Sequence, residues 1–278
     1  MGAFAPQAAP GPPLLFACAV EREATMTIAI LSALPQEQEG LVHALSDAQG
    51  TAHAGRMFWR GRLHGHDVVC ALSGIGKVAA ATTATALIER FGVRRIAFTG
   101  VAGGLGEGVR VGDVVVADEY LQHDLDASPI FPRWEMPGYG RTRLPCDPEM
   151  TAALLAAAQA CVAEAGEDLR AAHATTAPRA HQGLIASGDQ FVGTAGASCA
   201  LAQGLRAAGH EVLAVEMEGA AVAQACLDYG VPFAAMRTVS DRADDSAHVD
   251  FAEFVRVVAS RYALRVVDGF LRRLSAQR

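Results

Sequence analysis

The chain has 278 residues, of which 51% are hydrophobic and only 19% are charged. This composition excludes intrinsic disorder for most of the chain, because disordered segments combine low hydrophobicity with high charge. The formal net charge is -7, with 23 Lys and Arg residues against 30 Asp and Glu residues. Such a chain offers no basic field for the phosphates of a nucleic acid. Chemistry on a small molecule is therefore the favoured function, without a nucleic acid partner.

The six cysteines are widely spaced and include no Cys-x-x-Cys pair, a pattern typical of neither a zinc site nor a disulfide framework. We expect them to be small buried side chains in a reducing compartment, which predicts a cytoplasmic protein. No apolar run approaches the ~20 residues needed to cross a bilayer. No membrane partner is therefore expected.

Residues 1–25 are rich in Ala and Pro, and their apolar run Leu14–Val20 lacks the preceding positive charges of a secretory signal. We expect a disordered extension here. Because Met26 directly precedes the first predicted strand, a mis-assigned start codon is the other interpretation. A signal or lipid anchor stays open as an alternative. Residues 26–278 are expected to form a single domain.

The first half of this domain alternates strand-like and helix-like runs, which is the pattern of an α/β layered fold. Glycines mark two boundaries: Gly65 a turn between strands, and Gly92 the end of a helix. The expected strands are Thr27–Ala33, Arg56–Leu63, His66–Leu72, Arg95–Val101 and Val111–Tyr120, and the expected helices are Lys77–Phe91 and Pro148–Gly166.

The alternation continues in the second half. The expected strands are Gln182–Ser187, Glu211–Val215 and Pro232–Val239, and the expected helices are Ala197–Ala208, Gly219–Tyr229 and a closing helix from Asp250 to about Leu274. Between the halves, Leu121–Asp147 is irregular and rich in Pro and Gly, which favours a mobile active-site or subunit-contact loop.

Two glycine-rich stretches invite a nucleotide-binding interpretation that their neighbours oppose. Ser73–Val78 resembles the end of a P-loop, but Ala71 and Val78 stand where that motif needs Gly and a hydroxyl. Thr99–Gly108 follows a strand, yet a strand and not a helix comes next, so no helix N-terminus is available for a pyrophosphate. No dinucleotide cofactor is expected. Both stretches do permit a ligand to approach the backbone closely.

Carboxylates follow several strands at their carboxyl ends, where open α/β sheets bind ligands. Each one alone also fits a solvated turn or helix start. The candidates are Glu37, Glu216, Glu218 and Asp241. A metal is the competing use of such groups, but the spacings of His123, Asp124, Asp126, Asp244 and His248 match no common transition-metal site. We expect no metal.

Several motifs in order give the sequence a specific resemblance. They are Ser73–Ala79, Thr99–Leu105, Val111–Val115, Gly183–Phe191, Val215–Gly219 and Arg237–Asp241. Together they resemble the motifs of the 5′-methylthioadenosine/S-adenosylhomocysteine nucleosidases, and the match runs from about Met26 to Leu274. The resemblance implies the purine nucleoside phosphorylase-like fold: three α/β/α layers around a central mixed, twisted sheet.

The resemblance also implies roles for individual residues. Asp241 matches the general acid at the purine N7, and Glu37 the base that orients the attacking water. Glu218 matches the carboxylate that binds the ribose 2′- and 3′-hydroxyls, with Met217 against the sugar and Arg237 near the water. Hydrolysis of an N-glycosidic bond needs both a proton for the leaving base and a positioned water. Burial is expected to raise the pKa of Asp241 so that it can hold that proton.

For the base-binding side, the resemblance implies that Phe191 stacks on adenine and that Val192 reads its edge through backbone groups. Phe251 would close the apolar side, and Gly103 would lie against the substrate. One departure stands out: Val101 occupies a place where the family often has serine, which removes a hydroxyl near the water and ribose.

The expected activity is hydrolytic release of adenine from methylthioadenosine or S-adenosylhomocysteine without a cofactor. A phosphorolytic enzyme, a nucleosidase for another purine nucleoside such as a futalosine, and a non-catalytic nucleoside-binding protein stay open. We also expect a homodimer, because the apolar side chains between Ile130 and Tyr139 would be costly to expose as one patch and the resembling family walls its 5′ pocket with a neighbouring subunit.

Overall fold

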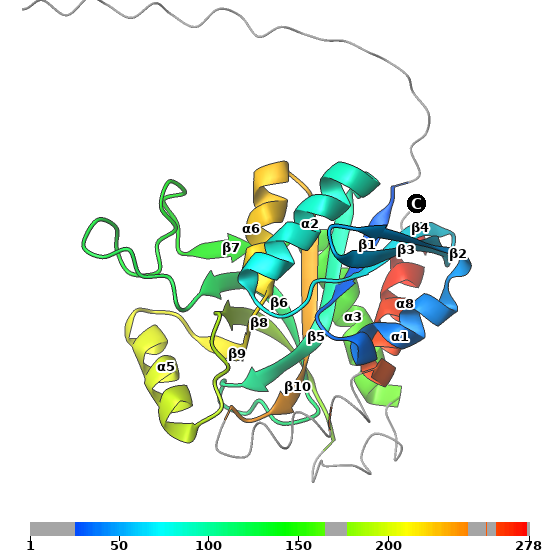
Figure 1. The fold of residues 1–278 in the computed structure, drawn as a ribbon. Coiled ribbons are helices and arrows are strands. Elements are labelled where there is room, and N and C mark those ends of the chain that lie inside the picture. The colour runs from blue at the N-terminus through cyan, green and yellow to red at the C-terminus, as the bar shows by residue number, and fades with distance from the viewer. Residues whose placement is uncertain (1–25, 165–176, 244–253, 255–259, 277–278) are drawn as a thin grey trace, which may run out of the picture.

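The computed structural model describes residues 26–164, 177–243, 254 and 260–276. They form one sheet and the helices around it (Figure 1). The strands are β1 (Ile28–Ser32), β2 (Ser46–His53), β3 (Arg56–Leu63), β4 (His66–Leu72), β5 (Arg95–Gly104), β6 (Val114–Gln122), β7 (Arg143–Pro145), β8 (Ala180–Ser187), β9 (Val212–Glu216) and β10 (Phe233–Asp241). The helices are α1 (Pro35–Ala44), α2 (Lys77–Phe91), α3 (Pro148–Glu164), α5 (Ala195–Ala207), α6 (Gly219–Tyr229) and α8 (Ser260–Ala276).

The sheet is mixed and partly closed on itself. Its strand order is β10-β6-β8-β9-β5-β1-β4-β3-β2, and β10 pairs with β5 as well. Strands β5, β10, β6, β8 and β9 therefore form a ring of paired strands, from which β1, β4, β3 and β2 extend. In the parallel pair of β5 and β10, Arg237 lies beside Gly100 and Asp241 beside Gly103. This register sets the geometry of the site described below.

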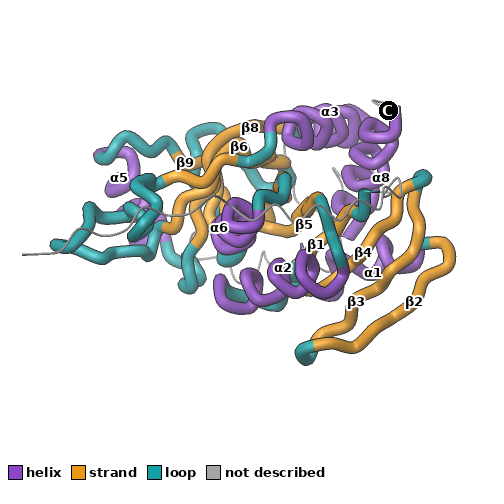
Figure 2. Tube along the Cα trace, turned by 90° about the horizontal axis from the view of Figure 1, so that it is seen from above, coloured by secondary structure: helices purple, strands orange, loops and turns teal. Residues whose placement is uncertain are grey.

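Two helical layers cover the sheet, which confirms the expected three-layer arrangement. Figure 2 shows α2 and α6 on one side of β1, β4 and β5, with α3 and α8 on the other. Strand β1 explains why both faces are covered: Ala29 and Leu31 pack in the core with α2 and α6, whereas Ile28 and Ile30 pack in the core with α3 and α8. Because successive strand residues point to opposite faces, an apolar strand needs two helical layers.

Most predicted elements agree with the structure to within a few residues. Helices α2 and α6 match their predicted bounds at both ends, and α2 ends at Gly92 in a left-handed conformation with φ of 66°. The predicted start of the closing helix at Asp250 lies outside the described residues. Among these residues no helix is long and apolar enough to span a membrane.

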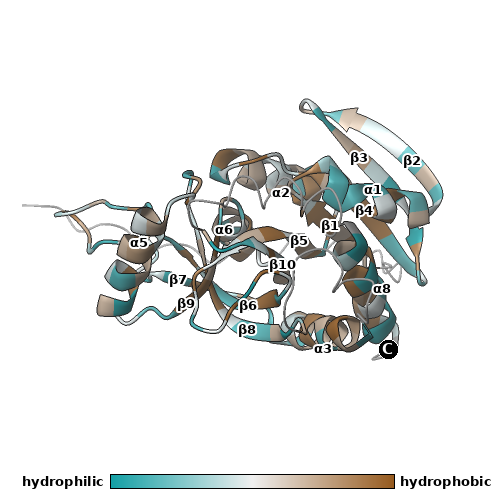
Figure 3. Ribbon diagram, turned by 90° about the horizontal axis from the view of Figure 1, so that it is seen from below, coloured by the Kyte–Doolittle hydropathy of each residue, from teal (hydrophilic) through white to brown (hydrophobic). Residues whose placement is uncertain are grey.

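Three elements were missed by the sequence patterns. Helix α1 and the short strand β7 were not predicted, and neither was β2, whose residues are all exposed. Figure 3 shows β2 at the outer edge with mostly hydrophilic residues. Its strand conformation comes from antiparallel pairing with β3 rather than from an apolar pattern of its own.

Two other expectations need correction. In the predicted irregular loop, Trp134 and Met136 are buried in the protein's own core, and the Trp134 indole N–H donates to the His123 carbonyl at 2.9 Å. The loop is thus anchored, and its apolar residues do not form one exposed patch, although Ile130 is 81% exposed. Of the cysteines, Cys199 is exposed rather than buried.

Candidate active site

A cavity of about 330 Å³ lies where the carboxyl ends of β1, β5 and β10 meet the end of β9, which runs antiparallel to β5. Eight of the nine residues predicted for the site line it: Glu37, Gly103, Phe191, Val192, Met217, Glu218, Arg237 and Asp241. The ninth, Phe251, lies outside the described residues. Segments that are distant in sequence are thus brought together around one cavity.

Glu37 enters the cavity from the first turn of α1, directly after β1. The backbone N–H groups of Ala33 and Leu34 both donate to its Oε2 at 2.9 Å, and the side chain is 1% exposed. Its Oε1 has no hydrogen-bond partner among the described residues. Burial raises the pKa of Glu37 to about 7, against the opposing effects of the Leu34 N–H and the Arg237 charge. One oxygen is therefore anchored, and the other is available to a ligand.

Asp241 enters the same cavity from the end of β10 and is 2% exposed. The Ser240 hydroxyl donates to its Oδ2 at 2.8 Å, and the Ala243 N–H donates to its Oδ1 at 2.8 Å. Both contacts come from residues within two positions along the chain. The carboxylate is thus held in place by its own turn.

Glycines of β5 face both carboxylates. A Cβ at Gly100 would lie 3.4 Å from Glu37 Oε1, and one at Gly103 would lie 3.0 Å from Asp241 Oδ1. Val101 and Ala102 lie between these glycines, and the three residue steps span roughly 10 Å of strand. The two carboxylates therefore lie near opposite ends of this stretch of β5, and both line the same cavity.

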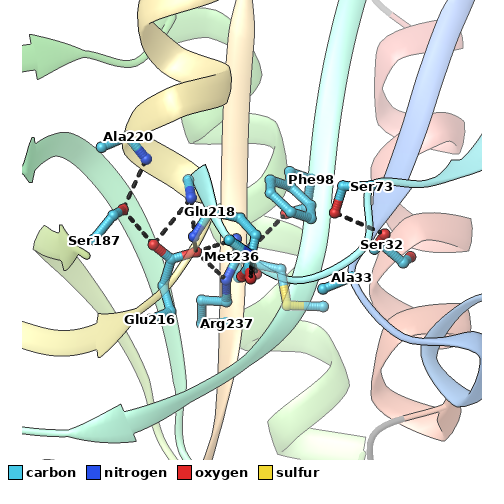
Figure 4. A network of polar contacts seen from close by, with 12 residues as sticks. Ser32, Ala33, Ser73, Phe98, Ser187, Glu216, Glu218, Ala220, Met236 and Arg237 are labelled. Carbon is cyan, nitrogen blue, oxygen red and sulfur yellow. Dashed lines mark hydrogen bonds and ion pairs between the residues drawn. The ribbon is translucent and has the colours of Figure 1, made fainter. Parts of the chain in front are cut away.

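Two buried charges of the site, Arg237 and Glu216, are paired with each other. The Arg237 guanidinium donates to Glu216 Oε2 from Nε at 3.1 Å and from Nη2 at 2.6 Å (Figure 4). Its Nη1 donates to the carbonyls of Phe98 and Met236, and the guanidinium stacks 4.1 Å from the centre of the Phe98 ring. All three nitrogens of Arg237 are thus committed within the protein.

Glu216 is the functional residue to which sequence reasoning assigned no role. Besides pairing with Arg237, it accepts from the Ser187 hydroxyl and from the N–H groups of Glu218 and Gly219 at the start of α6. The Ser187 hydroxyl in turn accepts from the Ala220 N–H at 2.8 Å. Carboxylates are favoured at helix N-termini, and here the contact fixes the backbone of Glu218. Its place at a strand's end was the only sequence signal.

Replacing Glu216 with glutamine should destabilise the fold strongly. It would leave the buried Arg237 charge without a counter-charge, which costs about 3–5 kcal/mol in comparable buried pairs. Urea unfolding followed by circular dichroism measures this loss. The matched control is Glu211→Gln, which breaks an exposed pair with Arg206 and should change stability by less than about 1 kcal/mol. Equal effects of the two substitutions would contradict the assigned importance of the buried pair.

Glu218 and Met217 lie at the turn between β9 and α6. The Gly76 N–H donates to Glu218 Oε1 at 2.8 Å. Burial, and next the nearby charge of Glu216, raise the pKa of Glu218 to about 8. Met217 is half-buried beside it, and Val101 contributes an apolar wall without a hydroxyl.

The cavity's outer rim is apolar and open. Phe191 and Ile75 line it and are both largely exposed, with Val192 half-buried next to Phe191. Ile75 was not predicted as a site residue. Exposed aromatic and aliphatic side chains at a cavity mouth suit a flat apolar ligand group. No group of three or more His, Cys, Asp or Glu side chains able to hold a metal was found among the described residues.

Comparisons with known proteins agree with this geometry. The family model described as the phosphorylase superfamily matches residues 27–272, which defines the class of the fold. A 5′-methylthioadenosine/S-adenosylhomocysteine nucleosidase of Shewanella denitrificans is 35% identical over 245 residues, covering 87% of this chain and 97% of that protein.

Solved structures give the same result. The nucleosidase of Neisseria meningitidis in complex with methylthio-immucillin-A matches with a TM-score of 0.78 and 33% identity, over 89% of this chain and 99% of that one. The Colwellia psychrerythraea enzyme in complex with adenine matches with a TM-score of 0.77 and 33% identity, over 89% and 95%. The chain therefore belongs to the 5′-methylthioadenosine/S-adenosylhomocysteine nucleosidase family.

Proposed function

We propose that this protein hydrolyses the N-glycosidic bond of 5′-methylthioadenosine, S-adenosylhomocysteine or both, releasing adenine and a 5-substituted ribose. The observation that carries the proposal is the pair of buried carboxylates, Glu37 and Asp241, at the two ends of the Gly100–Gly103 backbone in one cavity. An acid for the leaving base and a base for water are the two groups that the reaction requires.

In this mechanism Asp241 gives a proton to N7 of the departing adenine, so that the base leaves neutral. Glu37 accepts a proton from the attacking water with its unpartnered Oε1, while its Oε2 stays bonded to the backbone. The bond from the sugar carbon to the purine nitrogen breaks, and a bond to the water oxygen forms. A pKa of about 7 suits Glu37 to this role near neutral pH.

The other site residues bind the nucleoside. Glu218 accepts hydrogen bonds from the ribose 2′- and 3′-hydroxyls, and Met217 packs against the sugar. Phe191 stacks on adenine at the rim, with Val192 beside the base. Arg237 acts near the water through its charge, since its nitrogens are already bonded to Glu216 and to backbone carbonyls.

Arg237 also favours water over phosphate as the nucleophile. Phosphorolysis requires cationic donors that converge on a phosphate. Arg237 is the one cationic side chain among the described lining residues, and its nitrogens already donate to Glu216 or to backbone carbonyls. The buried carboxylate of Glu37 on the same side would repel an anion. No cofactor has a part in this proposal.

Purified protein should therefore release adenine from methylthioadenosine in phosphate-free buffer. The coproduct should be free 5-methylthioribose, identified by mass spectrometry. Added phosphate should leave the rate unchanged. Strict phosphate dependence with a ribose 1-phosphate product would contradict the hydrolase assignment, and tight binding of nucleosides without turnover would favour a non-catalytic binding protein.

We further infer a cytoplasmic homodimer, with residues 26–278 acting as one domain, that serves methionine salvage. Exposed apolar side chains supply the support for the dimer: Ile75 and Phe191 at the cavity rim, and Val78 in the first turn of α2. Isolated apolar side chains are common on surfaces, but a cluster beside a ligand site favours a partner surface. Light scattering should give twice the chain mass of 29.0 kDa. A fully active monomer would contradict the dimer.

A further inference from the structure

Lys77 follows the glycine-rich stretch that resembles a P-loop, and the proposed chemistry gives it no task. Lys77 is the first residue of α2. It is also the last residue of one rim of the cavity, which comprises residues 73–77. The facing rim, residues 189–192, follows β8 and carries Phe191. Strands β4 and β8, which lead into these rims, are not neighbours in the sheet. Pairing between these two strands therefore does not fix the two rims relative to each other.

Three residues join the rims, and we call them the clasp: Lys77, Asp124 and Asp189. The Lys77 N–H donates to Asp189 Oδ1 at 2.7 Å, and the Asp189 N–H donates to Asp124 Oδ2 at 2.8 Å. Lys77 Nζ closes the ring by donating to Asp124 Oδ1 at 2.6 Å. It also donates to Gln122 Oε1 at 3.0 Å. Backbone and side-chain groups of both rims are thus tied together.

The clasp is adjacent to the carboxylate proposed to bind ribose. The Gly76 N–H, one residue before Lys77, is the group that donates to Glu218 Oε1. Gly76 has a φ of 96°, and a Cβ there would lie 3.1 Å from Asp189 Oδ1. Glycine is therefore needed both for the backbone conformation and for the close approach of the clasp. Any shift of residues 76 and 77 would move the hydrogen-bond donor of Glu218.

Lys77 is the most important member of the clasp because it carries the clasp's positive charge. The clasp contains one ammonium and two carboxylates, and the side chains of Lys77 and Asp124 are only 17% and 20% exposed. Partial burial raises the pKa of Asp124, but the hydrogen bonds from Lys77 and from the Asp189 N–H outweigh it and lower the pKa. Without the ammonium, two carboxylates would remain close together and repel each other.

We propose that Lys77, Asp124 and Asp189 are positioning residues, which hold the Gly76 N–H against Glu218 and thereby orient the carboxylate that binds the ribose diol. This inference rests on the proposed function, because Glu218 has its role there. It assigns the lysine of the P-loop-like stretch to the substrate's sugar rather than to a phosphate.

The test is Lys77→Met, which removes the ammonium and keeps the backbone N–H and the length of the side chain. KM for methylthioadenosine should rise roughly tenfold, with a smaller change in kcat, because the diol contact acts already in the bound substrate. The 2′,3′-dideoxy analogue lacks the diol, so its KM should change less than about twofold. Adding Asp124→Asn to Lys77→Met should recover part of the loss, since it removes the repulsion. Arg272→Met, which breaks an exposed pair with Asp268, is the control.

Hydrogen exchange of the Gly76 and Lys77 amides tests the clasp without substrate. Both amides should exchange faster in Lys77→Met than in wild type and Arg272→Met. Unchanged exchange with an unchanged KM would overturn the proposal, as would equal KM increases for the diol and dideoxy substrates. If wild type releases no adenine, the proposed function fails, and the exchange result alone decides whether the clasp holds Gly76.

Discussion

Replacing Asp241 with asparagine should slow adenine release from methylthioadenosine by about 10²–10⁴-fold, the usual contribution of a positioned general acid. Asparagine keeps the shape of the side chain, and its amide oxygen can still accept from the Ala243 N–H. What it lacks is a proton for N7. Single-turnover kinetics should show the loss in the chemical step, with nucleoside binding retained.

A substrate with a different leaving group distinguishes a general-acid role of Asp241 from a merely structural role. The 4-nitrophenolate group of a 4-nitrophenyl riboside departs without protonation. Asp241→Asn should therefore cleave this substrate at nearly the wild-type rate. The control is Asp228→Asn on α6, whose carboxylate accepts from Tyr139 away from the cavity and whose loss should not affect turnover. Near-normal turnover of methylthioadenosine by Asp241→Asn would remove this residue from the mechanism.

Glu37→Gln should cause a loss of similar size, about 10²–10⁴-fold, but with every leaving group. The nitrophenyl riboside should not rescue this variant, because activation of water is needed whichever group departs. Comparing the two substrates on the two variants thus assigns acid and base separately. Rescue of Glu37→Gln by the nitrophenyl riboside would contradict the assignment of Glu37 as the base.

The pH profile follows from the raised pKa of Glu37. The base acts only when deprotonated, and burial moves that ionisation from 4.5 to about 7. Wild-type kcat/KM should therefore fall about tenfold per pH unit below pH 7, and this limb should disappear in Glu37→Gln. A limb with the same midpoint in the variant would assign the ionisation to another group, such as Glu218 with its pKa of about 8.

The raised pKa of Glu37 also predicts how the stability of the protein depends on pH. Measuring this dependence in Glu37→Gln shows in addition whether the variant is folded. Between pH 4.5 and 7 the unfolded chain releases the Glu37 proton while the folded protein keeps it. The free energy of unfolding therefore falls as the pH rises through this window. Glu37→Gln should lose this pH dependence and be more stable than wild type above pH 7, by about 1–3 kcal/mol. Urea unfolding at pH 5 and pH 8 measures the difference.

The sequence by itself determined the elements whose signals are local. Helix α2 was predicted from its run of Ala, Leu and Ile and from Gly92, which adopts the left-handed conformation that ends a helix. The predicted bounds of α6 also agree with the structure. The candidate carboxylates of the site also had a local signal. Carboxylates directly after strands, such as Glu37 and Asp241, lie at a sheet edge wherever those strands pair. Order along the chain was enough to nominate them.

Tertiary structure decided the partners of those residues. Only the parallel register of β5 and β10 sets Asp241 beside Gly103 and Arg237 beside Gly100. Arg237 pairs with Glu216 only because β9 joins the ring of paired strands in the folded sheet. Lys77 pairs with Asp124 only because the two rims of the cavity meet in the folded protein. Local sequence patterns indicate which face of a helix or strand is apolar. They do not report which distant polar group satisfies a buried charge, because that partner is chosen by the closing of the whole sheet, where burial makes an unpaired charge too costly to leave.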